Sequence, residues 1–223
     1  MEPARVVVTV RGSFTSRHAP ELATVRLAVA HEGDDKAAVY RRTVEAANAL
    51  VAVVRPLAAA ADGPATRWSS DRLHTWFERP WDQNGRQLAP VHHAQARVRV
   101  TFRDLDAFRG FLDDVGTRPG VAVEEVTWAL TEVHDREFAR EVRRRAVADA
   151  EQRALDYAQA AGFAAVTFVA VADVGLLDDG PMAGARRGKA VHMGVSTMDA
   201  GTPDLSPEDI VVAAEVEARF TAS

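Results

Sequence analysis

An alanine-faced helix from Asp135 to Gly162 is the feature that most constrains the fold of this chain. Apolar residues recur there at steps of three and four, which is the spacing of one face of an α-helix. They are Ala139, Val142, Ala146, Ala150, Ala154, Tyr157 and Ala161. Because methyl groups fill little volume, this face lets the helix backbone lie close against a broad apolar surface, and a β-sheet is the surface we expect. Asp135 is the expected N-cap, and Gly162 the expected left-handed residue after the helix.

The rest of the chain has the patterns of that sheet. Apolar and polar residues alternate, as in half-buried strands, over residues 6–11, 23–29, 67–78, 94–103, 121–130, 166–174 and 210–220. A helix at about 35–60 has Asp34 or Asp35 as its cap, and a shorter one ends at Gly116 and has Asp104 as its cap. We therefore predict an α+β fold, with a mostly antiparallel sheet of about seven strands and one long and two shorter helices packed on it.

Three irregular segments interrupt this pattern. The polar stretch at 13–21 is interpreted as a turn between the first two strands. The apolar phase shifts near Glu124 and Glu125, which predicts a β-bulge there. Residues 175–208 are rich in Gly, Pro, Asp and Ser and exceed the ~15 residues of an ordinary connection, so we expect a flexible loop before the last strand. We expect residues 1–223 to form a single domain.

Composition excludes several classes of function. Cysteine is absent, so disulfides, thiol catalysis and cysteine-ligated metal centres are excluded. The net charge of -5 gives no global attraction for nucleic acid or anionic lipid, and the basic clusters are short, at Arg143–Arg145 and at Arg186, Arg187 and Lys189. The amino terminus has no secretory-signal pattern, and no apolar run reaches the ~18 residues of a membrane span. We expect a cytoplasmic protein that neither spans a membrane nor binds nucleic acid.

Several segments, taken together, resemble the SIMPL domain family. The opening VVVTVRG, the segment Val98–Asp106, the helix stretch Ala146–Gly162 and the closing Pro207–Ile210 carry the likeness, which spans nearly all the chain. The family includes bacterial oxidative-stress-defence proteins, periplasmic immunogenic proteins and an animal protein that binds a signalling kinase. The resemblance implies an α+β fold and, for some bacterial members, large ring-like homo-oligomers. It does not imply a known catalytic site, so there are no active-site residues of the family to expect in this chain.

A group of large aromatic residues is the strongest candidate for an interaction surface. Trp68, Trp76, Phe77 and Trp81 lie on or beside a strand pair whose turn carries the hairpin signal Asn84-Gly85. If this pair projects as a ribbon, the rings form a surface for a partner or ligand. The other interpretation is that they pack beneath a helix as a small satellite core. The sequence leaves both interpretations open.

Polar clusters give weaker candidates. His31, Asp34 and Asp35 could surround a hard cation, although helix capping already explains the aspartates. His92 and His93 are neighbours in a strand, so their side chains point to opposite faces and do not converge on one metal.

Two further segments have residues used in catalysis or phosphate binding but lack the surrounding pattern. Ser13, Ser16 and His18 lack a nucleophile elbow and an identifiable oxyanion donor, so a polar turn is the preferred interpretation. The glycines of residues 175–208 match no phosphate-binding loop. No catalytic, cofactor-binding or metal site is therefore predicted.

The sequence favours a non-enzymatic, soluble SIMPL-family protein that self-assembles and has a stress-related or scaffolding role. Homo-oligomers and a protein partner are the expected interactions. The alternative is a small-molecule or metal-binding protein, or an unrecognised hydrolase, that uses the region of Trp68–Trp81 or of His31–Asp35.

Overall fold

The computed structural model describes residues 6–177 and 207–223. In this part of the chain, eight strands and three helices form two compact units, one made of residues 6–19, 130–177 and 207–223 and the other of residues 20–129. The predicted α+β class, the antiparallel pairing and the one long and two shorter helices are confirmed. The strands, however, divide into two sheets rather than one. One of the two units is assembled from both ends of the chain. The single domain expected over residues 1–223 stays a prediction.

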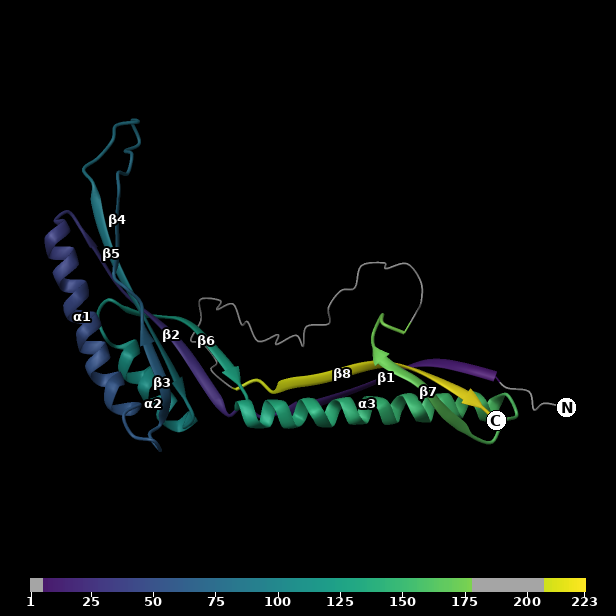
Figure 1. Ribbon diagram of the computed structural model, residues 1–223. Helices are drawn as coiled ribbons and strands as arrows, with labels where there is room; N and C mark the ends of the chain where they lie inside the picture. Colours follow the sequence, from purple (N-terminus) through teal and green to yellow (C-terminus); the bar gives the residue numbers. More distant parts are fainter. Residues whose placement is uncertain (1–5, 178–206) are drawn as a thin grey trace. The chain divides into compact units, whose positions relative to one another are not determined.

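The unit of residues 20–129 is a five-stranded antiparallel sheet with two helices. Its strands are β2 (Leu22–Gly33), β3 (Ala65–Ser70), β4 (His74–Glu78), β5 (Val91–Phe102) and β6 (Val121–Ala129), and its helices are α1 (Lys36–Leu57) and α2 (Leu105–Gly116). The strand order is β3-β5-β2-β6, and β4 also pairs with β5. In Figure 1 the hairpin of β4 and β5 extends beyond the end of α1, as the predicted ribbon requires.

Strand alternation builds the core of this unit on one face of the sheet. Val25 and Leu27 of β2 lie opposite Val100 and Val98 of β5, and all four are buried. Phe102, at the end of β5, packs against the rings of α2. The two helices begin where predicted, because the carboxylate of Asp35 accepts bonds from the first amides of α1 and that of Asp104 does the same for α2.

The other unit is a three-stranded antiparallel sheet with one long helix. Its strands are β1 (Val6–His18), β7 (Val166–Asp173) and β8 (Ile210–Ala222), in the order β1-β8-β7, and α3 (Glu132–Ala160) runs along the sheet (Figure 1). The turn predicted at 13–21 is wrong for residues 13–18, which belong to β1. β1 continues to His18 because β8 offers it a partner for its whole length, from Val6 opposite Ala222 to His18 opposite Ile210.

Helix α3 packs its alanine face on this sheet, as predicted. Val142, Ala146, Ala150, Ala154 and Ala158 are buried, and the first four form clusters with residues of β1 and β8. Each of these positions is four residues from the next, and a row with that spacing is inclined to the helix axis. The buried stripe therefore leaves the face that alternating steps of three and four residues would define. The two last residues predicted for the face are therefore wrong: Tyr157 is 64% exposed and Ala161 is exposed as well.

The ends of α3 agree only in part with the prediction. The helix begins at Glu132 after Thr131, and Asp135 lies in its first turn, where its amide donates to the Thr131 carbonyl at 2.8 Å. Asp135 is thus not the cap. Gly162 follows the helix with a φ of 88°, which confirms the left-handed residue predicted there.

The loop expected at 175–208 lies mostly outside the described residues, and so do Arg186, Arg187 and Lys189. Within residues 6–177 and 207–223, none of the helices combines the length and the apolar character that crossing a bilayer requires.

Candidate functional site

The five-stranded sheet has one face covered by helices and one polar face, which we call the open face. It carries the side chains of β2 and β5 that alternate with the core, among them Arg26, Arg97 and Arg99. Arg97 and Arg99 are exposed, and Arg26 is half-buried. The alternation of arginine with valine in β5 is thus a sequence signal for a basic sheet face, although the arginines of β2 and β5 are too far apart in sequence to stand out as one cluster.

Two of these arginines are neutralised by strand β6. The Arg26 guanidinium lies 2.8 Å from the Glu125 carboxylate, its cross-strand neighbour. The Arg97 guanidinium lies 2.9 Å from the Glu124 carboxylate. Glu124 is the extra residue of a bulge, since Arg26 is opposite Glu125 while Leu27 is opposite Val123. The predicted bulge is therefore confirmed, and it adds a second carboxylate to the open face.

Arg99 has a different environment. It lies opposite Arg26 on β2 and opposite Ser69 on β3, and it forms no ion pair or side-chain hydrogen bond with a described residue. A shallow depression of about 580 Å³ lies at this point of the sheet and is lined by Arg26, Asp71, Arg97, Arg99 and Glu124. Three cationic and two anionic side chains thus converge on one concave surface.

A stack of rings lies farther along β5 on the same face. The ring of His93 is parallel to that of Trp76, with centroids 5.0 Å apart. The ring of His74 also stacks on Trp76, with centroids 5.4 Å apart. Nδ1 of His93 lies 3.4 Å from the carboxylate of Glu32, while its Nε2 is buried without a hydrogen-bond partner among the described residues. The stack ties β4 to β5 at the base of the projecting hairpin.

The four aromatic residues predicted as an interaction surface do not share one face. Trp68 is opposite Val100 and is half-buried on the helix side of the sheet, and Phe77 is opposite His92 on that side. Trp76 is opposite His93 on the open face, and Trp81 lies beyond the end of β4, 67% exposed. Their role as an interaction surface stays a prediction. Trp76 is the member of the group on the open face, and Trp81 is the member at the end of the hairpin.

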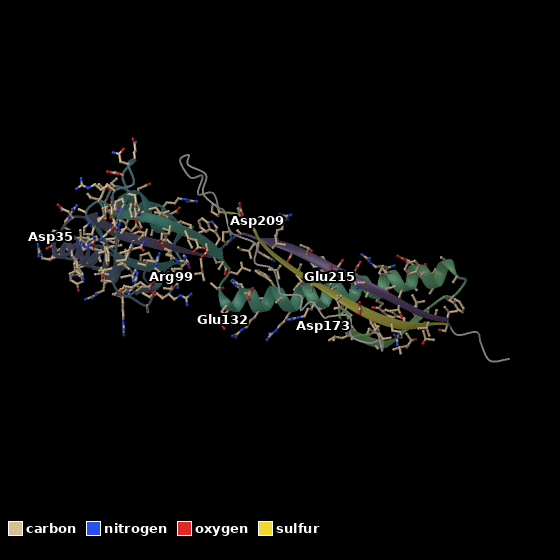
Figure 2. All side chains as sticks on the ribbon, turned by 90° about the horizontal axis from the view of Figure 1, so that it is seen from above. Asp35, Arg99, Glu132, Asp173, Asp209 and Glu215 are labelled. Carbon is tan, nitrogen blue, oxygen red and sulfur yellow. The ribbon has the colours of Figure 1, made fainter. Side chains whose placement is uncertain are left out.

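The His31–Asp35 region has structural roles for its polar groups. Asp35 caps α1, and the amide of Ala38 foremost, followed by that of Ala37, holds the pKa of its carboxyl below the ordinary value. Nδ1 of His31 lies 3.3 Å from the hydroxyl of Thr43, and burial, followed by the charge of Arg42, lowers the pKa of its ring. In the part of the chain that the structure describes, no three histidine, aspartate or glutamate side chains gather as metal ligands would. Figure 2 shows Asp35 and Arg99 at separate places on this unit.

The serine and histidine candidates lie on β1 in the other unit. Nε2 of His18 lies 2.8 Å from the Ser16 hydroxyl, and its ring stacks on Phe138 with centroids 3.6 Å apart. The amide of Ser13 donates to the carboxylate of Asp149 on α3 at 2.8 Å, so this residue joins strand and helix. Ser16 and His18 are two residues apart on a regular strand and not on a nucleophile elbow. A regular strand offers no backbone donors for an oxyanion.

The family comparison agrees with this architecture. The model of SIMPL, a protein family of unknown function (DUF541), matches residues 8–220. The chain belongs to the SIMPL family. The match spans both units, from β1 to β8, and confirms the resemblance seen in the sequence. No curated protein matches the sequence. Because the function of this family is unknown, the surfaces of this chain are the observations that bear on what it does.

Proposed function

We propose that this SIMPL protein is a non-catalytic protein that self-assembles through the edges of its three-stranded sheet and serves as a scaffold. The observation that carries the proposal is the edge strand β1. Its 13 residues pair with β8 on one side and, among the described residues, with no strand on the other. A long strand edge is a row of amide donors and carbonyl acceptors that another chain can extend.

Exposed apolar side chains on both edge strands also favour contact with another chain. On β1, Val7 is 60% exposed and Val6 and Phe14 are exposed as well. On β7, the opposite edge, Phe168, Val169 and Val171 are exposed. Burying such groups contributes about 25 cal/mol for each Å² removed from water, which adds to the hydrogen bonds of the edge. The stress-related role is part of the same proposal, and its support is the family resemblance.

Light scattering of the purified protein tests assembly. The chain has a mass of 24.1 kDa, and we expect a multiple of this mass that persists across micromolar concentrations. Val7→Lys should lower the mass if β1 is the contact edge, and the double change Val169→Lys and Val171→Lys should do so if β7 is. Val133→Lys is the matched control, because Val133 is 72% exposed and belongs to helix α3 rather than to either edge strand. A monomer at all concentrations would refute the proposal.

A further inference from the structure

The open face of the five-stranded sheet carries an arginine whose charge is not balanced. Arg26 and Arg97 each have a carboxylate partner from β6, whereas Arg99 lies directly across from Arg26 and has none among the described residues. Like charges opposite each other on neighbouring strands are destabilising. Glu125 offsets this for Arg26, and a bound anion beside Arg99 would supply the counter-charge that Arg99 lacks among the described residues.

The surroundings of Arg99 also supply a place for the rest of a ligand. The depression of about 580 Å³ is within the size range of small-molecule sites. Its five lining residues are all charged, so a charged, polar ligand fits its chemistry better than an apolar one. The carboxylates of Asp71 and Glu124 can accept hydrogen bonds, and the hydroxyl-bearing Ser69 lies opposite Arg99 on β3.

We propose that this depression binds a small phosphorylated polyol, with its phosphate between Arg99 and Arg26 and its hydroxyl groups on Asp71. A phosphate monoester carries a charge of about −1.5 to −2 at neutral pH and three acceptor oxygens, enough for two guanidinium groups at once. Each guanidinium presents a planar fork of donors that matches such an oxyanion. A carboxylate has one charge and two oxygens, and so suits the pair of arginines less well.

Nuclear magnetic resonance of the arginine Nε–H groups tests the proposal on the full chain at constant ionic strength. The probes are inorganic phosphate, glucose 6-phosphate, glucose and acetate. We expect saturable shifts with inorganic phosphate, tighter binding of glucose 6-phosphate, and no binding of glucose or acetate in the same range. Absence of a saturable shift with either phosphate would overturn the proposal, and acetate binding as tightly as phosphate would overturn the choice of phosphate.

Variants assign the binding to Arg99. Arg99→Gln should weaken glucose 6-phosphate binding by about tenfold or more, because charge-assisted bonds are lost. Arg99→Lys keeps the charge without the fork and should weaken it less. Arg86→Gln is the control, since Arg86 is exposed in the hairpin loop and does not line the depression. Unchanged binding in folded Arg99→Gln or Arg99→Lys protein, checked by thermal unfolding, would overturn the assignment.

One more variant tests the position of the polyol. Asp71→Asn should weaken the binding of glucose 6-phosphate without weakening that of inorganic phosphate, because only the hydroxyl groups are placed against this carboxylate and the change removes a negative charge near the phosphate. Equal loss for both probes would contradict this part of the proposal.

Discussion

The backbone of Gly12 lies so close to helix α3 that a Cβ atom there would come within 2.7 Å of the Cβ atom of Ala150. The same atom would lie 2.1 Å from the carbonyl oxygen of Ala146, far inside van der Waals contact. The glycine of β1 and the alanines of α3 are therefore the two sides of one close approach of helix to strand. This explains why the helix face is built from methyl groups, because larger side chains would hold the backbones apart.

Gly12→Ala should destabilise the protein. The added methyl group meets helix backbone rather than a flexible side chain, so strand or helix has to shift, and overpacking of this kind costs about 1–3 kcal/mol or more. The free energy of unfolding in urea measures the effect. Gly110→Ala is the control: a Cβ there meets nothing within 4 Å, and replacing glycine inside α2 should stabilise by about 0.5–1 kcal/mol. A Gly12→Ala protein as stable as the wild type would contradict the close contact.

Neighbouring residues at the end of α3 should respond differently to the same change. Ala158 is buried and Tyr157 is mostly exposed. Ala158→Asn places an amide in the interface and should cost about 2 kcal/mol. Tyr157→Asn changes a solvent-facing side chain and should cost less than about 1 kcal/mol. Thermal unfolding compares the two, and the reverse order would show that the helix face is turned toward Tyr157 instead.

Serine substitutions separate the two exposed tryptophans. Trp76→Ser removes the ring stacked on His93 and His74, and should lower the unfolding free energy by about 1–2 kcal/mol. Trp81→Ser removes a ring at the hairpin end and should change it by less than about 0.5 kcal/mol. Light scattering on both variants tests the predicted interaction surface. A reduced mass in folded protein supports that surface, whereas lost stability with unchanged mass argues against it.

Local chemistry explains why much of this fold is predictable from sequence. Asp35 and Asp104 cap the helices they precede, Gly162 ends the long one, and the phase change at Glu124 marks a real bulge. Each of these features depends on residues a few positions apart, whose side chains and backbone determine the local conformation.

The distribution of strands over two sheets, in contrast, cannot be predicted from residues that are close in sequence. β1 pairs with β8, which lies at the other end of the chain, and no local pattern in either strand specifies that partner. The open face has the same origin, because Arg26 and Arg99 meet only through the register of β2 with β5. The arginines of β5 alternate within one stretch of sequence, but nothing in that stretch specifies that Arg26 of β2 and the carboxylates of β6 lie beside them.

Asp149 should make the stability of the three-stranded unit sensitive to acid. Its carboxylate accepts the amide hydrogen of Ser13 and pairs with Arg153 at 2.9 Å. The Ser13 amide foremost, and Arg153 after it, hold the pKa of this carboxyl below its ordinary value near 3.8. The folded state therefore binds this proton less readily than the unfolded state. The stabilisation is fully present above pH 3.8 and is lost as the pH falls through the lower, folded-state pKa.

Asp149→Asn tests this linkage. The variant should be less stable than the wild type at neutral pH, and the difference in unfolding free energy should shrink as the pH falls below 3.8 and through the folded-state pKa, where the wild-type carboxylate loses its charge. Urea unfolding at a series of pH values measures it. Glu151→Gln is the control on the exposed side of the same helix, since Glu151 makes no hydrogen bond or ion pair with a described residue. A difference for Asp149→Asn that is independent of pH would show that the Ser13 contact does not depend on the charge of the carboxylate.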